Sequence, residues 1–255
     1  MTNAVRVTLE HDERVLCVRL VRPKANIVDG EMTAALSAAF DKVNGMHHLK
    51  AVLLAAEGPH FSFGASVEEH LPDQCADMLR GFHALIMTIV SCPVPVLVAV
   101  NGQCLGGGLE LALAGHLIFA APGAQMGQPE IRLGVFAPAA SCLLPLRTGH
   151  QQAEDMLLSG RSIDAEAAQR CGLITTISDD PEAAALTYYD THYAGLSASS
   201  LRLAVEAART HFTAEVRARL AHVERLYLDK LMTQTDALEG LNAFLEKRAP
   251  VWRDA

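Results

Sequence analysis

The sequence lacks the short motifs on which several large enzyme classes depend. It contains no C-x-x-C pair, no H-E-x-x-H zinc motif, no G-x-S-x-G nucleophile elbow and no P-loop. A G-x-G-x-x-G dinucleotide fingerprint is also missing, because Leu111 stands where its last glycine is required. His47 and His48 lie in a polar turn without a ligand partner at helical spacing. We therefore expect no bound metal and no nucleotide cofactor.

Basic residues are in the minority, and long apolar runs are absent. The 21 lysines and arginines are outnumbered by 29 aspartates and glutamates, so the net charge of -8 repels polyanions. The longest apolar stretch, residues 86–100, contains Pro93 and Pro95 and is shorter than the ~20 residues of a membrane-spanning helix. The N-terminus offers no apolar export segment. These features predict a soluble, unexported protein without nucleic-acid or membrane partners.

Cysteines are few and widely scattered. The six of them show no paired spacing, which favours reduced, small core residues in a cytoplasmic protein over a disulfide framework. They are Cys17, Cys75, Cys92, Cys104, Cys142 and Cys171.

Short apolar strands alternate with amphipathic helices along the first two thirds of the chain. Residues 5–9 and 15–20 flank a polar turn and predict an antiparallel hairpin. Asp29 is the expected N-cap of a helix. Further elements are expected as helices over 30–44 and 73–91 and as strands over 51–55, 94–100 and 117–121. Beyond about residue 180 only helical patterns remain. The order predicts a layered α/β core with a helical C-terminal region.

The segment Gly102–Gly115 places three consecutive glycines before an apolar helical run whose only charged residue is Glu110. Glycines inside a helix cost roughly 1 kcal/mol each relative to alanine, so their place at its start indicates a backbone requirement. The free N–H groups there could hold a developing negative oxygen, with the Glu110 carboxylate aimed back toward them. The alternative is that the glycines only permit close helix packing and that Glu110 reaches solvent.

A second carboxylate follows a proline in the segment Gly127–Gly134. Pro129 fixes the local backbone and apolar residues surround Glu130, which fits a positioned acid, but this segment alone favours an exposed turn glutamate. Two such carboxylates could hold a water between them, one as general base and one as acid. The loop over 60–69 could supply another free backbone N–H.

Taken together, these segments resemble a known family. The F-x-x-G-A loop at Phe61–Ala65, the V-N-G-x-x-L-G-G-G-x-E-L segment at Val100–Leu111 and the G-x-P-E turn at Gly127–Glu130 resemble the crotonase, or enoyl-CoA hydratase/isomerase, superfamily. The likeness extends from residues 22–26 to residues 239–248. It implies a crotonase-type spiral of ββα units over residues 1–195. A C-terminal helical region over 196–255 would serve oligomerisation and cover CoA.

The resemblance also implies roles for individual residues. The backbone N–H groups of Ala65 and Gly107 would form an oxyanion hole for the oxygen of an acyl-CoA thioester. Glu110 and Glu130 match the two carboxylates of the family's hydratases, and the sequence leaves open which is acid and which is base. The remaining substrate- and CoA-binding positions that the resemblance implies are Lys24, Ala25, Asn26, Ser66, Val67, Gly106, Gly134, Phe136, Phe244 and Lys247. Phe244 and Lys247 resemble residues that often reach CoA from a neighbouring subunit. No cofactor is expected beyond the CoA of the substrate.

The sequence departs from ordinary hydratases at two places. Ser66 stands where an aspartate is usual, and residues 135–145 carry Phe136, Pro138 and alanines where straight-chain hydratases have a glycine-rich stretch. This altered wall, with Pro-Lys-Ala-Asn-Ile-Val-Asp29, resembles the cyclohexa-1,5-diene-1-carbonyl-CoA hydratases of anaerobic aromatic (benzoyl-CoA) degradation. The resemblance implies hydration of a cyclic dienoyl-CoA through an enolate.

Three alternatives remain at this point. The chain could be a straight-chain enoyl-CoA hydratase or isomerase of fatty-acid oxidation, or a hydrolase or ring-cleaving relative that shares the oxyanion hole. It could also be an RNA-binding or scaffold homologue, which its acidic charge disfavours. A homotrimer or homohexamer is expected, because rings of this family close with such symmetry.

Overall fold

The computed structural model describes residues 4–255, and a six-stranded sheet forms its centre. The sheet has the order β1-β2-β3-β4-β6-β9, in which β1 and β2 pair antiparallel and all the other neighbours pair parallel. Its strands are β1 (Val5–Glu10), β2 (Val15–Leu20), β3 (Ala51–Ala56), β4 (Val96–Val100), β6 (Leu117–Ala120) and β9 (Thr176–Ile177). The predicted hairpin and the three predicted buried strands are therefore confirmed.

A second, three-stranded sheet has the order β5-β7-β8. It contains β5 (Gln103–Leu105), β7 (Gln125–Gly127) and β8 (Ser162–Asp164). The main-sheet strands β4 and β6 are each followed by a short strand of this second sheet. Repeated strand–strand–helix units are typical of the spiral that the sequence predicts.

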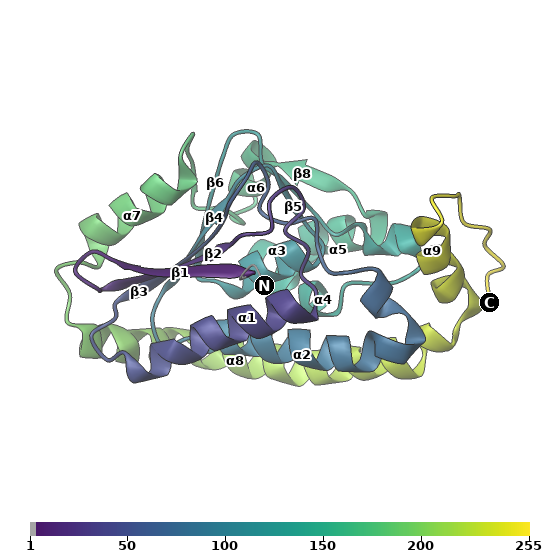
Figure 1. Cartoon of the computed structure of the whole chain (residues 1–255), viewed down its shortest axis with the longest axis horizontal. Coiled ribbons are helices and arrows are strands. Elements are labelled where there is room, and N and C mark those ends of the chain that lie inside the picture. Colours follow the sequence, from purple (N-terminus) through teal and green to yellow (C-terminus); the bar gives the residue numbers. More distant parts are fainter. Residues whose placement is uncertain (1–3) are drawn as a thin grey trace.

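Helices cover both faces of the main sheet (Figure 1). They are α1 (Gly30–Asp41), α2 (Pro72–Val90), α3 (Gly107–Ala114), α4 (Pro138–Thr148), α5 (His150–Ser159), α6 (Ala165–Arg170), α7 (Pro181–His192), α8 (Ala198–Asp229) and α9 (Thr235–Leu245). Short 3-10 turns η1 (Lys42–Gly45), η2 (Glu68–His70), η3 (Pro129–Leu133) and η4 (Leu231–Thr233) link them. No helix within residues 4–255 is long and apolar enough to cross a membrane.

Strand β3 explains why helices must lie on both faces, since all six of its residues are buried. Val52 and Leu54 pack into the large cluster that includes side chains of α1 and α2, whereas Leu53 packs with Tyr189 of α7 on the opposite face. A strand without a polar face needs cover on both sides.

The boundaries differ slightly from those predicted. Asp29 caps α1 as expected, its carboxylate accepting the Met32 N–H at 2.8 Å, but the α-helix ends at Asp41 and continues as η1. Asn44 and Gly45 are poor helix formers, which explains the change. The predicted strand over 94–100 begins only at Val96, after Pro95.

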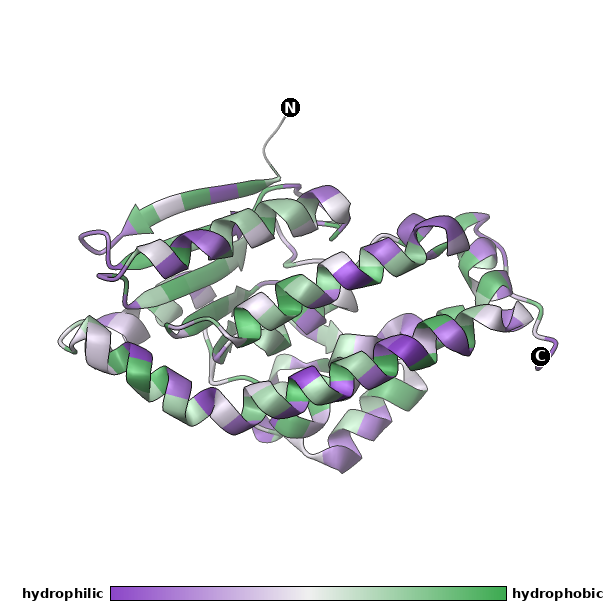
Figure 2. Ribbon diagram, turned by 90° about the horizontal axis from the view of Figure 1, so that it is seen from below, coloured by the Kyte–Doolittle hydropathy of each residue, from purple (hydrophilic) through white to green (hydrophobic). Residues whose placement is uncertain are grey.

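The C-terminal helices lie against the core rather than apart from it. Helix α8 is 32 residues long and packs along α2 and α4, as Figure 2 shows from below. Helix α9 then packs on η3, and a Cβ atom on Gly240 would lie only 2.1 Å from the Leu133 carbonyl oxygen. The predicted boundary near residue 195 falls in the turn between α7 and α8. Residues 1–3 of the predicted core lie outside the described residues.

Two arginines hold the C-terminal end of α3. Arg209 of α8 donates to the Ala114 carbonyl at 3.1 Å and to Gly115, and Arg147 of α4 donates to the Leu113 carbonyl at 2.8 Å and also to Gly115. Both guanidinium groups lie over the Phe212 ring, with their carbon atoms 4.6 and 5.2 Å from its centroid. The last carbonyls of a helix have no hydrogen-bond donors inside it, so the two arginines supply the missing donors. Their positive charges also interact favourably with the negative end of the helix dipole.

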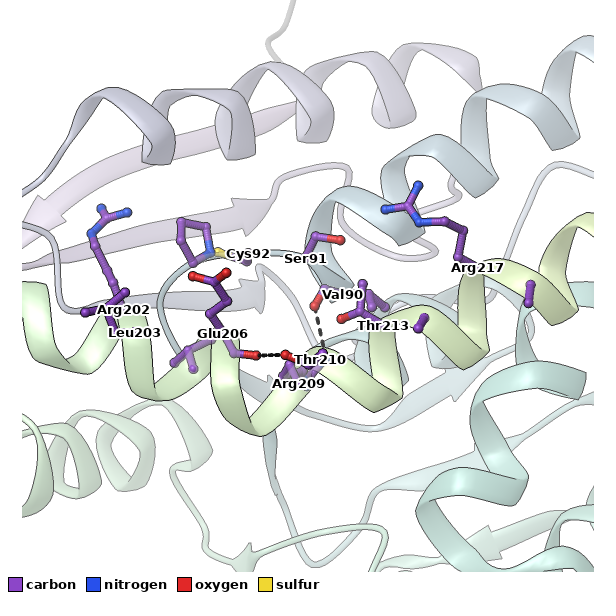
Figure 3. A pocket seen from close by; sticks show the side chains of 14 residues that line it. Val90, Ser91, Cys92, Arg202, Leu203, Glu206, Arg209, Thr210, Thr213 and Arg217 are labelled. Atoms are coloured by element: carbon purple, nitrogen blue, oxygen red, sulfur yellow. Dashed lines mark hydrogen bonds between the residues drawn. The ribbon is translucent and has the colours of Figure 1, made fainter.

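We expect Arg209→Met to destabilise the protein by about 3 kcal/mol, because buried carbonyls would lose charged donors. Arg217→Met is the matched control: Arg217 lies on the same helix (Figure 3) and is exposed, and within residues 4–255 it forms no hydrogen bond or ion pair. Its loss should change stability by less than about 0.5 kcal/mol. Urea unfolding measures both, and equal stability of the two variants would contradict this role of Arg209.

Candidate active site

Two backbone amides from distant segments meet at the start of α3. Val28 forms a parallel bridge with Ala65: the Val28 N–H donates to the Gly64 carbonyl, and the Ser66 N–H donates to the Val28 carbonyl. Backbone groups alternate in direction along an extended segment, so the Ala65 N–H points to the other side. Among residues 4–255 it donates to no protein acceptor.

The Gly107 N–H is the second of these amides. It belongs to the first residue of α3 and, within the described chain, also donates to no protein acceptor. A Cβ atom on Gly107 would lie 3.0 Å from the Ala65 nitrogen, and one on Gly64 would lie 3.4 Å from the Gly107 nitrogen. The absence of side chains lets the two segments approach until both free donors lie side by side.

A network of hydrogen bonds holds the Ala65 segment in place. The Ser62 hydroxyl donates to the Asn26 carbonyl at 2.8 Å and accepts the Gly64 N–H at 3.0 Å. The buried Asn26 side chain donates to the carbonyls of Glu57 and His60, both at 3.1 Å. A Cβ atom on Gly108 would lie 2.6 Å from that of Ser62, so α3 packs directly on this network.

Glu110 of α3 is buried, with 5% of its surface exposed, and its carboxylate lies at the N-terminus of α4. One carboxylate oxygen accepts the Ala140 N–H, in the first turn of α4, at 2.7 Å. Burial raises the pKa of Glu110 well above its usual range, although the Ala140 and Ala139 amides act in the opposite direction. The alternative in which Glu110 reaches solvent is therefore wrong.

Glu130 lies in η3 and is half-buried. Its carboxylate faces the backbone of Gly106, where an added Cβ atom would lie 2.5 Å from a carboxylate oxygen. Gly106 also has φ of 50°, a backbone conformation that favours glycine. Burial raises the pKa of Glu130, and the neighbouring charge of Glu110 raises it further. Like charges in one site oppose ionisation of both groups, so this pair can hold a proton near neutral pH.

Gln128 is a contact of Glu130 that sequence reasoning missed. Its side chain is 1% exposed, and with its amide nitrogen turned to Glu130 it donates to the two carboxylate oxygens at 3.0 and 3.1 Å. Gln128 was visible only as a variable position of the G-x-P-E motif, and only the folded turn brings its amide to the carboxylate.

The amides and carboxylates line a cavity of about 560 Å³. Nine of the sequence-predicted site residues lie in its wall: Ala65, Ser66, Val67, Gly106, Gly107, Glu110, Glu130, Phe136 and Phe244. Phe244 lines the cavity of its own chain and keeps 54% of its surface exposed. The Ser66 hydroxyl donates to Glu68 at 3.0 Å.

The other five predicted residues lie outside this wall: Lys24, Ala25, Asn26, Gly134 and Lys247. The Asn26 side chain is fully used in holding the loops described above, and an added Cβ atom on Gly134 would lie 2.7 Å from the Asp236 carbonyl oxygen of α9. Lys24 and Lys247 are exposed, each with a positive φ. Their binding roles stay predictions.

Two histidines in the wall were also missed. His70 lies at the end of η2, with Nδ1 2.7 Å from the Ser66 carbonyl oxygen, and His83 lies on α2 beside Glu224 of α8. His83 continues the apolar face of α2 that contains Leu79, Phe82 and Ile86, so the sequence offered no signal beyond an isolated histidine at a core position.

A second cavity, of about 610 Å³, lies between α8 and the turn after α2 (Figure 3). It offers no pair of carboxylates, and Arg209 in its wall is already engaged with backbone carbonyls. Within residues 4–255 no cluster of three or more potential ligands could hold a metal ion. The six cysteines are all free, and five are buried.

The first cavity thus combines two free amide donors with two carboxyl groups of raised pKa. Such donors stabilise an oxyanion by roughly 3–4 kcal/mol each, and such carboxyls suit general acid–base catalysis. The arrangement can hold a carbonyl oxygen and move protons at the carbons next to it.

Comparison with known proteins agrees with this chemistry. A cyclohexa-1,5-dienecarbonyl-CoA hydratase of Thauera aromatica is 58% identical over 253 residues, covering 99% of this chain and 98% of the relative. A carnitinyl-CoA dehydratase of Salmonella typhi is 31% identical over 252 residues, covering 94% and 95%. The crystal structure of an enoyl-CoA hydratase/isomerase from Pseudoalteromonas atlantica T6c superposes with a TM-score of 0.84 at 30% identity, covering 98% of this chain and 99% of that one.

These likenesses confirm the expected fold. The family model for enoyl-CoA hydratase/isomerase matches residues 10–255. With that match and relatives of this identity over nearly the whole chain, the protein belongs to the enoyl-CoA hydratase/isomerase family.

Proposed function

We propose that the protein is a hydro-lyase that reversibly adds water to a cyclic conjugated dienoyl-CoA thioester. The proposed substrate is cyclohexa-1,5-diene-1-carbonyl-CoA and the product is 6-hydroxycyclohex-1-ene-1-carbonyl-CoA, as part of anaerobic aromatic degradation. The 58% identity to the Thauera aromatica hydratase over 99% of the chain is the observation that carries this proposal.

The site supports the reaction step by step. The amides of Ala65 and Gly107 bind the thioester oxygen, and Glu110 takes a proton from water as its oxygen attacks the carbon β to the thioester. The electron pair of the double bond moves toward the carbonyl, which gives a dienolate whose charge the two amides stabilise. Glu130 holds the attacking water against Glu110, and one proton delivered to the γ carbon of the dienolate completes the addition.

The wall of the cavity supports a cyclic acyl group. Phe136 packs against Tyr227 with ring centroids 5.2 Å apart, which fixes a flat apolar surface beside the carboxylates. Pro138 begins α4 directly after this wall and stiffens it. A rigid, flat wall favours a planar ring over a flexible straight chain. Ordinary hydratases have a glycine-rich stretch at this position, which leaves a straight acyl chain more conformational freedom.

The reaction needs no cofactor beyond the CoA of the substrate. Lys24 and Ala25, on the segment that the buried Asn26 holds in place, are proposed to bind CoA at the mouth of the cavity together with Lys247 and Phe244. A homotrimer or homohexamer in the cytoplasm is proposed on the family resemblance alone.

Replacing either carboxyl group by its amide should abolish most of the activity. We expect Glu110→Gln and Glu130→Gln each to lower kcat on the cyclic dienoyl-CoA at least ~100-fold, because neither amide can exchange a proton. Glu154→Gln, at an exposed position of α5, is the matched control and should keep full activity. Wild-type rates in both site variants would exclude the assignment.

The raised pKa of Glu130 also predicts a change in stability with pH. Above the unfolded-state pKa of about 4.3 the native carboxyl still binds a proton that the unfolded chain has lost, so its contribution to stability falls as the pH rises through the higher native pKa. Glu130→Gln should therefore gain thermal stability relative to wild type on going from pH 4 to pH 9. Melting temperatures of both proteins across this range measure the effect, and a constant difference would argue against a raised pKa.

The altered wall predicts substrate preference. The kcat/KM for cyclohexa-1,5-diene-1-carbonyl-CoA should exceed that for crotonyl-CoA, because the ring covers more of the flat wall at Phe136 than the short crotonyl chain does. A direct comparison of both thioesters on the same preparation decides this. A preference for crotonyl-CoA would instead favour a straight-chain hydratase.

A further inference from the structure

Helix α2 places one imidazole in an otherwise apolar wall of the active-site cavity. Met78, Leu79, Phe82 and His83 line the cavity from this helix. Only 5% of the surface of His83 is exposed, so its ring is removed from bulk water. A buried polar side chain in an apolar wall needs a partner or a function.

One edge of the His83 ring is fixed by a carboxylate. Its Nδ1 lies 2.5 Å from a carboxylate oxygen of Glu224, which reaches it from α8. The other nitrogen, Nε2, is buried and has no hydrogen-bond partner among the described residues. Burial lowers the pKa of His83, against the opposing effect of Glu224. A neutral ring that donates from Nδ1 to Glu224 carries its lone pair on Nε2, which makes that nitrogen a base.

The proposed reaction requires a proton donor in hydration, and a base in dehydration, at a position that straight-chain hydration does not use. Water adds to the β carbon of the dienoyl thioester, and the resulting dienolate can accept a proton at its α or its γ carbon. Only protonation at the γ carbon leaves the remaining double bond conjugated with the thioester. The γ carbon lies across the six-membered ring from the hydrated carbon, so the group that serves it must lie apart from the one that activates water.

We propose that His83, held by Glu224, is the catalytic residue that exchanges a proton with this γ carbon; the inference rests on the proposed function. In dehydration, Nε2 takes the γ proton, the C–H electron pair enters the conjugated dienolate, and the hydroxyl leaves as water with a proton from a site glutamate. In hydration, Nε2–H returns the proton to the γ carbon and the glutamate takes one from water. Both groups return to their starting protonation states once the product leaves and water enters the cavity, and no oxidation or reduction occurs.

The geometry favours His83 over the other imidazole in the wall. The Nδ1 of His70 faces the neutral carbonyl of Ser66, which cannot compensate a positive charge on the ring. His83 instead has a carboxylate partner, which stabilises the imidazolium that forms during proton transfer. Glu130 remains with Glu110 at the water position, where its contact with Gly106 places it.

Proton exchange on a thioester without a hydroxyl group isolates this step. Cyclohex-1-ene-1-carbonyl-CoA has the γ hydrogens but no water to lose, so incubation in D2O reports γ-proton removal alone. We expect the wild-type protein to incorporate deuterium at the γ carbon, detected by NMR and mass spectrometry. His83→Gln should slow this exchange at least ~100-fold while binding the thioester with unchanged affinity.

Two further variants keep the test decisive. Glu224→Gln retains the imidazole and should slow exchange at least ~10-fold, which also gives a result if His83→Gln fails to fold. His11→Gln removes the imidazole of another histidine–carboxylate pair, 3.0 Å from Asp190 outside the cavity, and should exchange at the wild-type rate. Wild-type exchange rates in His83→Gln and Glu224→Gln would overturn the inference, as would loss of thioester binding in parallel with exchange.

A separate measurement of cyclic dienoyl-CoA hydration distinguishes failure of the role of His83 from failure of the proposed function. A wild-type protein that hydrates the dienoyl thioester but does not exchange γ protons contradicts only the role of His83. A wild-type protein that hydrates no cyclic dienoyl-CoA contradicts the proposed function and the inference with it.

Discussion

The close contact between the Gly64–Ala65 segment and the glycine-rich start of α3 is the constraint on which the site depends. Two amides can point at one oxygen only if no side chain separates their backbones, and a Cβ atom on Gly107 would lie 3.0 Å from the Ala65 nitrogen. The surrounding structure secures this contact from both ends of the helix. Ser62 and Asn26 fix the loop on one side, while Arg147 and Arg209 bind the last carbonyls of α3 on the other.

Electrostatics then turns this backbone geometry into a reactive site. The Glu110 carboxylate accepts a hydrogen bond at the N-terminus of α4, and Glu130 lies against Gly106. Burial raises the pKa of both carboxyl groups, and the charge of Glu110 raises that of Glu130 further. A buried site of this kind is costly to stability, because two acids are held where water solvates them poorly. The same low dielectric strengthens the interaction of the two amides with a developing oxyanion.

The sequence predicts the parts of the site that depend on local chain geometry. Gly106, Gly107 and the proline before Glu130 are residue types with special backbone conformations, which the sequence shows directly. The position of Glu110 follows from its spacing, one helical turn after Gly107. The pairings that join distant segments were not predictable in this way. Glu224 meets His83 across 141 residues, and Arg209 meets Ala114 across 95, so neither contact leaves a local pattern. The contact of Gln128 with Glu130 was not predictable for a different reason: the sequence of a turn does not indicate whether a glutamine side chain is buried or exposed.

In the proposed function the amides of Ala65 and Gly107 polarise the thioester carbonyl. Infrared difference spectroscopy of bound benzoyl-CoA, labelled with 13C at the thioester carbon, tests it most directly, because this aromatic thioester presents the carbonyl without reacting. We expect the carbonyl band to move to lower frequency on binding, because two hydrogen bonds weaken the C=O bond. A band that stays at its position in water, or moves to higher frequency, would contradict it.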